Sequence, residues 1–144
     1  EKDFARAMFA PFGLELIFSK VAIKPGKPVW FGRAKGRWII GLPGNPTSAI
    51  VTARLFLAPL IAGLAGRDAA STLDWRKVIL TMALKACGDR ETFERGRMVD
   101  GGIAVLGTQD SGSQKALASA DVLIRRRPGT PALSAADTAD VLDF

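Results

Sequence analysis

The sequence predicts a mixed α/β fold in which an α/β part is followed by a small all-β part. Two observations carry this prediction: a long apolar stretch at residues 47–64, and a series of short β-like segments after residue 75. With 144 residues, 48% of them hydrophobic, the chain can bury a core. We expect the α/β part at residues 1–69, a linker at 70–75 and the β part at 76–144.

The α/β part combines two helices with several strands. Residues 3–12 carry apolar side chains at helical spacing, with Asp3 as a candidate N-cap. Residues 15–23 are β-rich, and residues 29–42 hold two apolar runs around a Lys-Gly turn, which is typical of a hairpin. A helix over residues 47–64 should be buried on most of its circumference, because it carries a single charged residue.

The β part shows period-two alternation and frequent turn residues. Val78, Leu80, Met82 and Leu84 alternate with other residues and predict a strand with one buried face. Further strands are expected at residues 93–99, 103–106, 121–126 and 138–142, with a short helix at residues 113–120.

Composition excludes several kinds of site. The chain has no histidine and a single cysteine, Cys87, so histidine-based triads and soft metal sites are excluded and any metal must be held by oxygen. We expect Cys87 to be a small buried or half-buried residue. The net charge of +6 favours an anionic partner. Because stacking aromatics do not interleave with basic runs, we expect small phosphorylated ligands and no nucleic acid.

No localisation signal stands out in the chain. The apolar stretch 49–64 is interrupted by Arg54 and Pro59 and is shorter than the roughly 20 residues that span a bilayer. Neither a signal peptide nor a lipidation motif appears at either end. We expect a soluble, cytoplasmic protein with no membrane partner.

Residues 41–48 form a candidate anion-binding loop between a β-run and the long helix. Asn45 suits the N-cap and Pro46 the first helical position. Gly41 and Gly44 permit unusual backbone geometry and close approach of a ligand. A helix N-terminus offers N–H groups and partial positive charge to an oxyanion. The alternative is a plain strand-to-helix turn, which the physics alone favours.

Residues 20–28 form a basic segment stiffened by proline. Lys20 and Lys24 are four residues apart, which places them on one face of an extended strand, and Lys27 follows in the turn. Three lysines beside a rigid loop could bind a pyrophosphate or oxyanion. The alternative is a solvated strand edge, on which lysines discourage aggregation.

Together the two segments resemble a known family. KVAIKPGKP at residues 20–28, followed after a dozen residues by GLPGNPTSA at 41–49, closely resembles the molybdopterin molybdenumtransferases. That family includes the E domain of gephyrin and its plant counterpart. The resemblance implies the C-terminal part of a molybdopterin-binding, adenylyltransferase-like three-layer α/β domain, followed by a small β-barrel-like domain. It also implies that a phosphate loop and further N-terminal domains would precede this sequence.

The resemblance implies roles for individual residues. Lys20 and Lys24 match functional lysines of the family, and Lys27 lies in the same segment. The loop implicated in molybdate insertion is matched by these residues: Pro43, Gly44, Asn45, Pro46, Thr47 and Ser48. Asp3 resembles the family's acidic residue that helps to hold Mg²⁺ near the nucleotide phosphates.

The resemblance continues more weakly into the β part. Arg95 lies in a segment similar to the family's phenylalanine-x-arginine-glycine strand, and Ser113 in one similar to its glutamine-glycine-serine turn. Ser111 stands where the family usually has glutamine. The alternatives are a strand-surface ion pair for Arg95 and a helix N-cap for Ser113. We expect residues 125–127, three arginines, to form a solvated strand end.

The implied reaction joins two anions. Molybdate would be inserted into adenylylated molybdopterin with release of AMP. A molybdopterin adenylyltransferase would be a partner, and the protein would act as a homodimer. Lys20, Lys24 and the helix N-terminus would offset the repulsion between the anions. Two other classes of function remain: a gephyrin-like scaffold or inactive fragment, and a basic nucleic-acid-binding domain. The sequence does not distinguish molybdate from tungstate.

Overall fold

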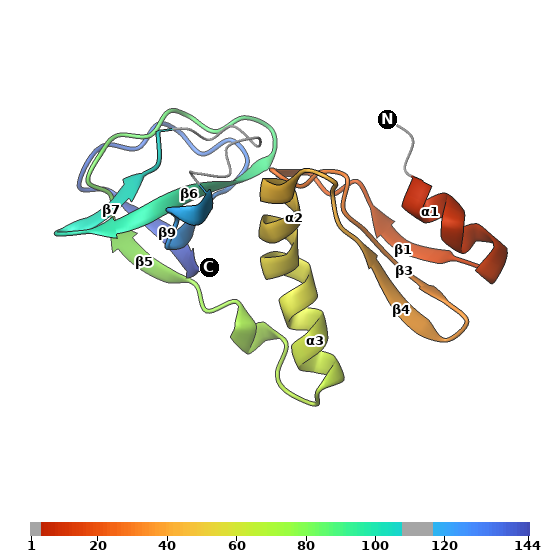
Figure 1. The fold of residues 1–144 in the computed structure, drawn as a ribbon. Helices are drawn as coiled ribbons and strands as arrows, with labels where there is room; N and C mark the ends of the chain where they lie inside the picture. Colours follow the sequence, from red (N-terminus) through yellow and green to blue (C-terminus); the bar gives the residue numbers. More distant parts are fainter. Residues whose placement is uncertain (1–3, 108–116) are drawn as a thin grey trace.

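The computed structural model describes residues 4–107 and 117–144 of the chain. It confirms the predicted fold class, a mixed α/β part followed by a β-rich part. In Figure 1 the long helix stands between two sheets, with the N-terminal hairpin on one side and the C-terminal strands on the other.

The first sheet has three antiparallel strands in the order β1-β3-β4. Its strands are β1 (Glu15–Ser19), β3 (Trp30–Ala34) and β4 (Arg37–Gly41). A short helix α1 (Phe4–Phe9) and a 3-10 turn (Ala10–Phe12) precede it. The tight turn between β3 and β4 uses Lys35 and Gly36, both with positive φ. The predicted hairpin over residues 29–42 is thereby confirmed.

The long helix runs without a break from Pro46 to Leu64. It consists of α2 (Pro46–Thr52), a π-helical stretch (Ala53–Leu57) and α3 (Ala58–Leu64). The π stretch lies directly before Pro59, whose ring has no N–H and would meet the carbonyl four residues earlier. A wider turn at this point is a common way to absorb such an interruption.

The C-terminal sheet curls toward a barrel. Its order is β2-β6-β8-β9-β5, and β7 pairs with β6. Thr81 N–H donates to the carbonyl of Ile103 at 2.9 Å, which joins the chain just after β5 to β7. The strands are β2 (Ile23–Lys24), β5 (Arg76–Ile79), β6 (Glu91–Val99), β7 (Gly102–Val105), β8 (Val122–Arg126) and β9 (Thr138–Asp143).

One hydrophobic cluster joins the helix to both sheets. Val51 and Leu55 of the helix pack with Phe93, Leu123 and Leu142 of the C-terminal sheet. Phe18 and Ile40 of the first sheet border the same cluster. A second cluster fills the curled sheet: Leu80, Leu84, Ile103, Val122, Ile124, Ala139 and Val141. The division of the chain at residues 70–75 stays a prediction, and β2 pairs with β6 across it.

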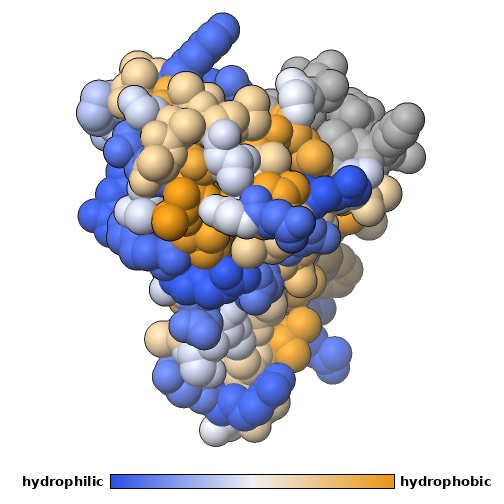
Figure 2. Space-filling view, turned by 90° about the vertical axis from the view of Figure 1, so that its left-hand side faces the viewer, coloured by the Kyte–Doolittle hydropathy of each residue, from blue (hydrophilic) through white to orange (hydrophobic). Residues whose placement is uncertain are grey.

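One expectation about burial is wrong, and a second holds only in part. The helix is not buried on most of its circumference, because Ile50, Ile61 and Leu64 are 45%, 52% and 63% exposed. The strand predicted from Val78 ends at Ile79; Leu80 and Leu84 of its predicted buried face are buried, but Met82 is 43% exposed. In both cases the apolar pattern is present, but neighbouring elements cover only part of it. In Figure 2, which looks onto the C-terminal part, a hydrophobic patch lies among hydrophilic residues.

Candidate functional site

The helix begins at the N-cap that the sequence predicts. Asn45 has an extended backbone, and its side-chain oxygen accepts a hydrogen bond from Ser48 N–H at 3.2 Å. Pro46 follows as the first helical residue. The side chain of Thr47 is fully buried, and its hydroxyl has no hydrogen-bond partner among the described residues. Its assigned role in ligand binding stays a prediction.

The glycines of this loop do not have the predicted unusual backbone geometry. Neither Gly41 nor Gly44 has a positive φ. Gly41 is required for packing, since a Cβ there would lie 2.0 Å from the Trp30 indole. A Cβ on Gly44 would meet nothing within 4 Å, so Gly44 faces open space that a ligand can approach.

The basic segment is not one extended strand, so the predicted shared face of Lys20 and Lys24 is wrong. Lys20 has a φ of 58° and lies between β1 and β2, which belong to different sheets. Lys24 is the last residue of β2 and is exposed. The turn at residues 25–28 returns the chain to β3 and carries Lys27, also exposed.

Predicted site residues from three distant segments meet at one pocket, which we call the lysine pocket. Lys24 and Lys27 come from the basic segment, Ser48 from the first turn of α2, and Arg95 from β6. Its volume is about 550 Å³, and its lining also includes Pro25, Gly26, Pro28, Arg90, Thr92, Phe93 and Glu94. The lysines, the arginines and the helix N-terminus give it a positive field suited to an anion.

The other predicted site residues lie elsewhere. Lys20, Pro43, Gly44 and Asn45 do not line the lysine pocket as the structure describes it. Pro46 instead lines a separate apolar pocket with Ile50, Leu117, Ala118, Ala120 and Phe144. Asp3 and Ser113 fall outside the described residues, as does the first half of the helix expected at 113–120.

Arg95 is not the surface residue of the alternative interpretation. It is 2% exposed, although it lies in a nine-residue strand. In the register of β6 with β8, Arg95 faces Leu123 and its neighbour Gly96 faces Val122. The strands pack closely at Gly96, since a Cβ at this position would lie 2.7 Å from the side chain of Ile124.

The three consecutive arginines do not form the solvated strand end that the sequence suggests. Arg126 is 3% exposed and donates through Nη2 to the carbonyls of Lys85 and Pro131, at 3.0 and 3.1 Å. Arg125 is half-buried, pairs with Glu91 and lies over the ring of Trp75. Of the three, only Arg127 is exposed.

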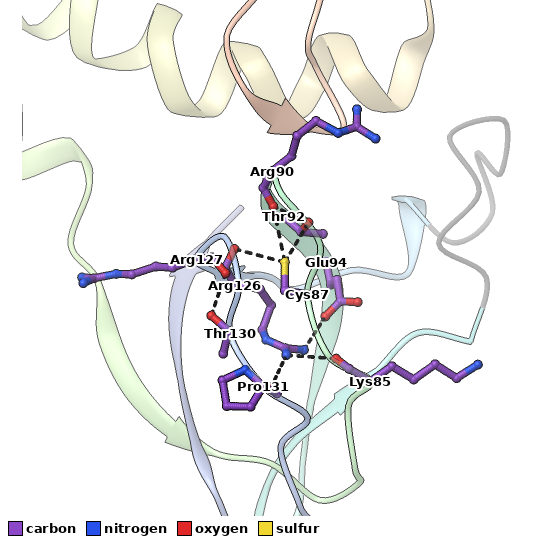
Figure 3. Close-up of polar contacts among 9 residues, drawn as sticks. All are labelled: Lys85, Cys87, Arg90, Thr92, Glu94, Arg126, Arg127, Thr130 and Pro131. Atoms are coloured by element: carbon purple, nitrogen blue, oxygen red, sulfur yellow. Dashed lines mark hydrogen bonds and ion pairs between the residues drawn. The ribbon is translucent and has the colours of Figure 1, made fainter.

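Cys87 lies close to Arg126, in the loop at residues 85–90 that precedes β6 (Figure 3). Its Sγ is 3.3 Å from both the carbonyl of Arg90 and the hydroxyl of Thr92, and 3.8 Å from the carbonyl of Arg126. The thiol is half-buried, as predicted. Figure 3 also shows the side chain of Arg90 extending from this loop toward the helix.

Sequence reasoning did not identify Arg90, Thr92 and Glu94 as site residues. All three line the lysine pocket. They lie at the start of β6, whose parallel pairing with β2 brings Glu91 opposite Ile23 and Thr92 opposite Lys24. A basic residue just before a strand is a common surface feature, so no signal in the single sequence marks this pairing.

The helix Pro46–Leu64 is, by length and composition alone, able to cross a membrane, and among the described residues it is the one helix of this kind. The core helix of a soluble protein passes the same test. Val51, Leu55 and Ala62 of this helix are buried within the chain, while Ile50, Ile61 and Leu64 are exposed.

Two family models match consecutive parts of the chain. Residues 1–63 match the model of a probable molybdopterin binding domain. Residues 77–144 match the model of the MoeA C-terminal region, domain IV.

Individual proteins resemble the chain over much of its length. A molybdopterin molybdenumtransferase of Haemophilus influenzae is 44% identical over 101 residues, which is 67% of this chain and 24% of that protein. The molybdenum cofactor synthesis protein cinnamon of Drosophila melanogaster is 32% identical over 133 residues, 86% of this chain and 21% of that protein. The chain therefore spans about a quarter of the length of these relatives.

A solved structure shares the fold. The molybdopterin biosynthesis MoeA protein from Pyrococcus horikosii superposes with a TM-score of 0.82 at 24% sequence identity. The match covers 99% of this chain and 35% of that protein. Both sheets and the helix between them therefore belong to one known arrangement.

Proposed function

This chain belongs to the molybdopterin molybdenumtransferase family and corresponds to the C-terminal portion of its members. On that premise we propose that it takes part in inserting molybdate into adenylylated molybdopterin with release of AMP. Its place in molybdenum cofactor biosynthesis follows from the family. The substrates, the leaving group and the roles of single residues are the proposal.

One observation carries the proposal. Lys24, Lys27, Ser48 and Arg95, all assigned to the site from the sequence, come from three separate segments and line the same pocket. Oxyanions are bound in proteins by charge-assisted hydrogen bonds, for which lysine, arginine and hydroxyl groups are suitable donors. A pocket of about 550 Å³ holds more than a single ion, and a substrate that carries phosphates fits this size class.

The proposed work of these residues is electrostatic. Lys24 and Lys27 are flexible point charges on a proline-stiffened turn, so they can follow the charge that shifts between phosphate and molybdate oxygens. Arg95 is buried, and Ser48 lies in the first turn of the helix, at its positive end. No side chain near the pocket has to act as a covalent nucleophile.

The magnesium assignment stays a prediction. Within residues 4–107 and 117–144, no group of three or more histidine, cysteine, aspartate or glutamate side chains could hold a metal ion. Asp3, the residue assigned to Mg²⁺, lies outside these ranges. The roles of Asp3, Lys20, Pro43 and Ser113 stay predictions.

The biological setting is also part of the proposal. Adenylylated molybdopterin would come from a molybdopterin adenylyltransferase, and the protein would act as a cytoplasmic homodimer. The family supports a small molybdopterin-related substrate, while the partner enzyme and the dimer rest on the resemblance.

Calorimetric titration of the full-length protein with molybdate and with AMP tests the proposal. Lys24→Ala and Lys27→Ala should each weaken binding about tenfold, because a hydrogen bond to a charged group contributes roughly 1.5 kcal/mol. Lys77→Ala is the matched control, since Lys77 is exposed and pairs with Asp140 outside the pocket. Equal affinity in the pocket variants and the control would remove the lysine pocket as the binding site.

A further inference from the structure

A second, smaller pocket adjoins the lysine pocket and has no role in the proposed function. We call it the arginine pocket; its volume is about 200 Å³. Lys24, Arg90, Thr92 and Glu94 line both pockets. The remaining wall of the arginine pocket consists of Lys85, Ala86, Cys87, Gly88, Asp89 and Arg126.

The lining of the arginine pocket is positively charged. Four of its side chains are basic and two are acidic, which leaves an excess of two positive charges. An excess of positive charge around a recess attracts an anion. The basic residues are Lys24, Lys85, Arg90 and Arg126, and the acidic ones are Asp89 and Glu94.

The guanidinium of Arg126 is the second, independent observation. Its side chain is 2% exposed, yet the nearest carboxylate oxygen, Oε2 of Glu94, is 3.5 Å from Nη1, beyond good hydrogen-bond distance. Nε of Arg126 and Oε2 of Glu94 have no hydrogen-bond partner among the described residues. Two neutral carbonyls hold Nη2. A buried cation whose ion pair is long and whose Nε has no hydrogen-bond partner among the described residues favours a further anion nearby.

We propose that the arginine pocket is a second oxyanion subsite, which takes one tetrahedral oxyanion such as phosphate, sulfate or molybdate. Arg126 supplies the buried charge, and Lys85 and Arg90 line the pocket from the loop at residues 85–90. The pocket is smaller than the usual pocket for a nucleotide-sized ligand, which favours a single ion or one phosphate group.

The two pockets place two anions side by side. Lys24 and Arg90 line both of them, so each can contact an ion in either pocket and offset the repulsion between the two ions. This inference rests on the proposed function, in which an oxyanion and a phosphorylated ligand must occupy neighbouring positions.

Cys87 provides a local test, because it lines the arginine pocket and is the one cysteine of this sequence. We would measure the rate at which neutral iodoacetamide alkylates Cys87 in the full-length protein, read by peptide mass spectrometry, during titration with sulfate, molybdate or AMP. A bound oxyanion should slow alkylation severalfold. Protection by the inorganic ions identifies a free ion as the occupant, and protection by AMP alone identifies a phosphate group of a larger ligand.

Matched lysine variants separate the two pockets. Lys85→Ala, on the wall of the arginine pocket, should raise the half-protecting ion concentration about threefold or more. Lys27 lines only the lysine pocket, so Lys27→Ala should change the half-protecting ion concentration by less than about twofold. The same holds for Lys77→Ala, because Lys77 lies outside both pockets. If Lys27→Ala abolishes protection and Lys85→Ala does not, the ion binds in the lysine pocket alone, which overturns this inference and leaves the proposed function standing. If calorimetry records ion binding but no ion slows the alkylation of Cys87, the ion likewise binds in the lysine pocket alone and this inference is overturned.

Discussion

Loss of the Arg126 side chain should destabilise the fold clearly, because this cation is buried. Arg126→Leu would leave Oε2 of Glu94 and the carbonyls of Lys85 and Pro131 in a buried setting without their cation. We expect the free energy of unfolding to fall by about 3 kcal/mol, which is typical when one partner of a buried pair is removed. Urea denaturation measures this change.

The neighbouring arginine is the control for Arg126. Arg127→Leu changes an exposed side chain and should alter stability by less than about 0.5 kcal/mol. The double variant Arg126→Leu/Glu94→Leu should be more stable than Arg126→Leu alone, because it no longer buries an uncompensated carboxylate. Equal losses in Arg126→Leu and Arg127→Leu would contradict the buried pair.

The two loop glycines should respond in opposite ways to an added methyl group. Gly41→Ala would place a Cβ 2.0 Å from the Trp30 indole and should destabilise the protein by about 1–3 kcal/mol through overpacking. Gly44→Ala has open space and ordinary backbone angles, so stability should change by less than about 0.5 kcal/mol. Thermal unfolding of both variants measures the difference.

Gly44→Ala also tests how closely a ligand approaches the loop. If molybdate or AMP contacts the backbone at Gly44, the variant should bind more weakly while its stability stays unchanged. Unchanged affinity would place the ligand away from this loop and confine it to the lysine pocket. Gly41→Ala cannot serve for this test, since its packing defect would alter the loop itself.

The sequence identifies some residues of the lysine pocket and misses others for a clear reason. Lys24, Lys27 and Ser48 lie in two motifs whose residue types point to an anion. Arg90 and Glu94 carry no such signal, because they reach the pocket through pairing between strands that lie far apart in the sequence. Burial of Arg126 was equally hidden, since three arginines in a row suggest solvent.

At the scale of elements, substitutions in the N-cap of α2 can change the stability of the protein and its affinity for molybdate independently. Asn45→Ala removes the side-chain acceptor for Ser48 N–H and should lower stability by about 1 kcal/mol, while Asn45→Ser should keep the cap. Asn45→Asp also keeps the cap but adds a negative charge one turn from Ser48 in the lysine pocket. We expect it to weaken molybdate binding about threefold, through charge repulsion.

Unfolding and calorimetric titration of the three Asn45 variants provide both measurements. If Asn45→Asp binds molybdate as tightly as the unchanged protein, the helix N-terminus is not near the bound anion. In that case the lysines alone would account for binding, and the capped turn would be purely structural.

Elements with a local signal are the ones that the sequence predicts well. The hairpin has its Lys-Gly turn, and the long helix has a cap at Asn45 and a stop at Gly66, which has positive φ. The π-helical stretch Ala53–Leu57 and the two-residue strand β2 have no local signal. β2 exists because β6 pairs with it, and its pairing explains why Lys20 and Lys24 are separated.

At the scale of the whole molecule, the shared hydrophobic cluster implies that the two parts of the chain unfold together. Leu142 of β9 is 1% exposed and packs in the same cluster as Val51 and Leu55 of the long helix. Residues 70–75 were predicted to divide the chain into two domains. Packing across this division depends on contacts between residues about ninety positions apart, which no local pattern reports.

Leu142→Ala distinguishes one cooperative unit from two independent domains. The substitution removes buried methyl groups from the shared cluster and should destabilise the protein by about 2–5 kcal/mol. In one cooperative unit, amide hydrogen exchange should accelerate in α2 as much as in β6, because both open in the same global event. Ile124→Ala, in the cluster inside the curled sheet, is the matched change at a site away from the helix. Acceleration confined to the C-terminal strands in the Leu142 variant would mean that residues 70–75 join two parts that unfold separately.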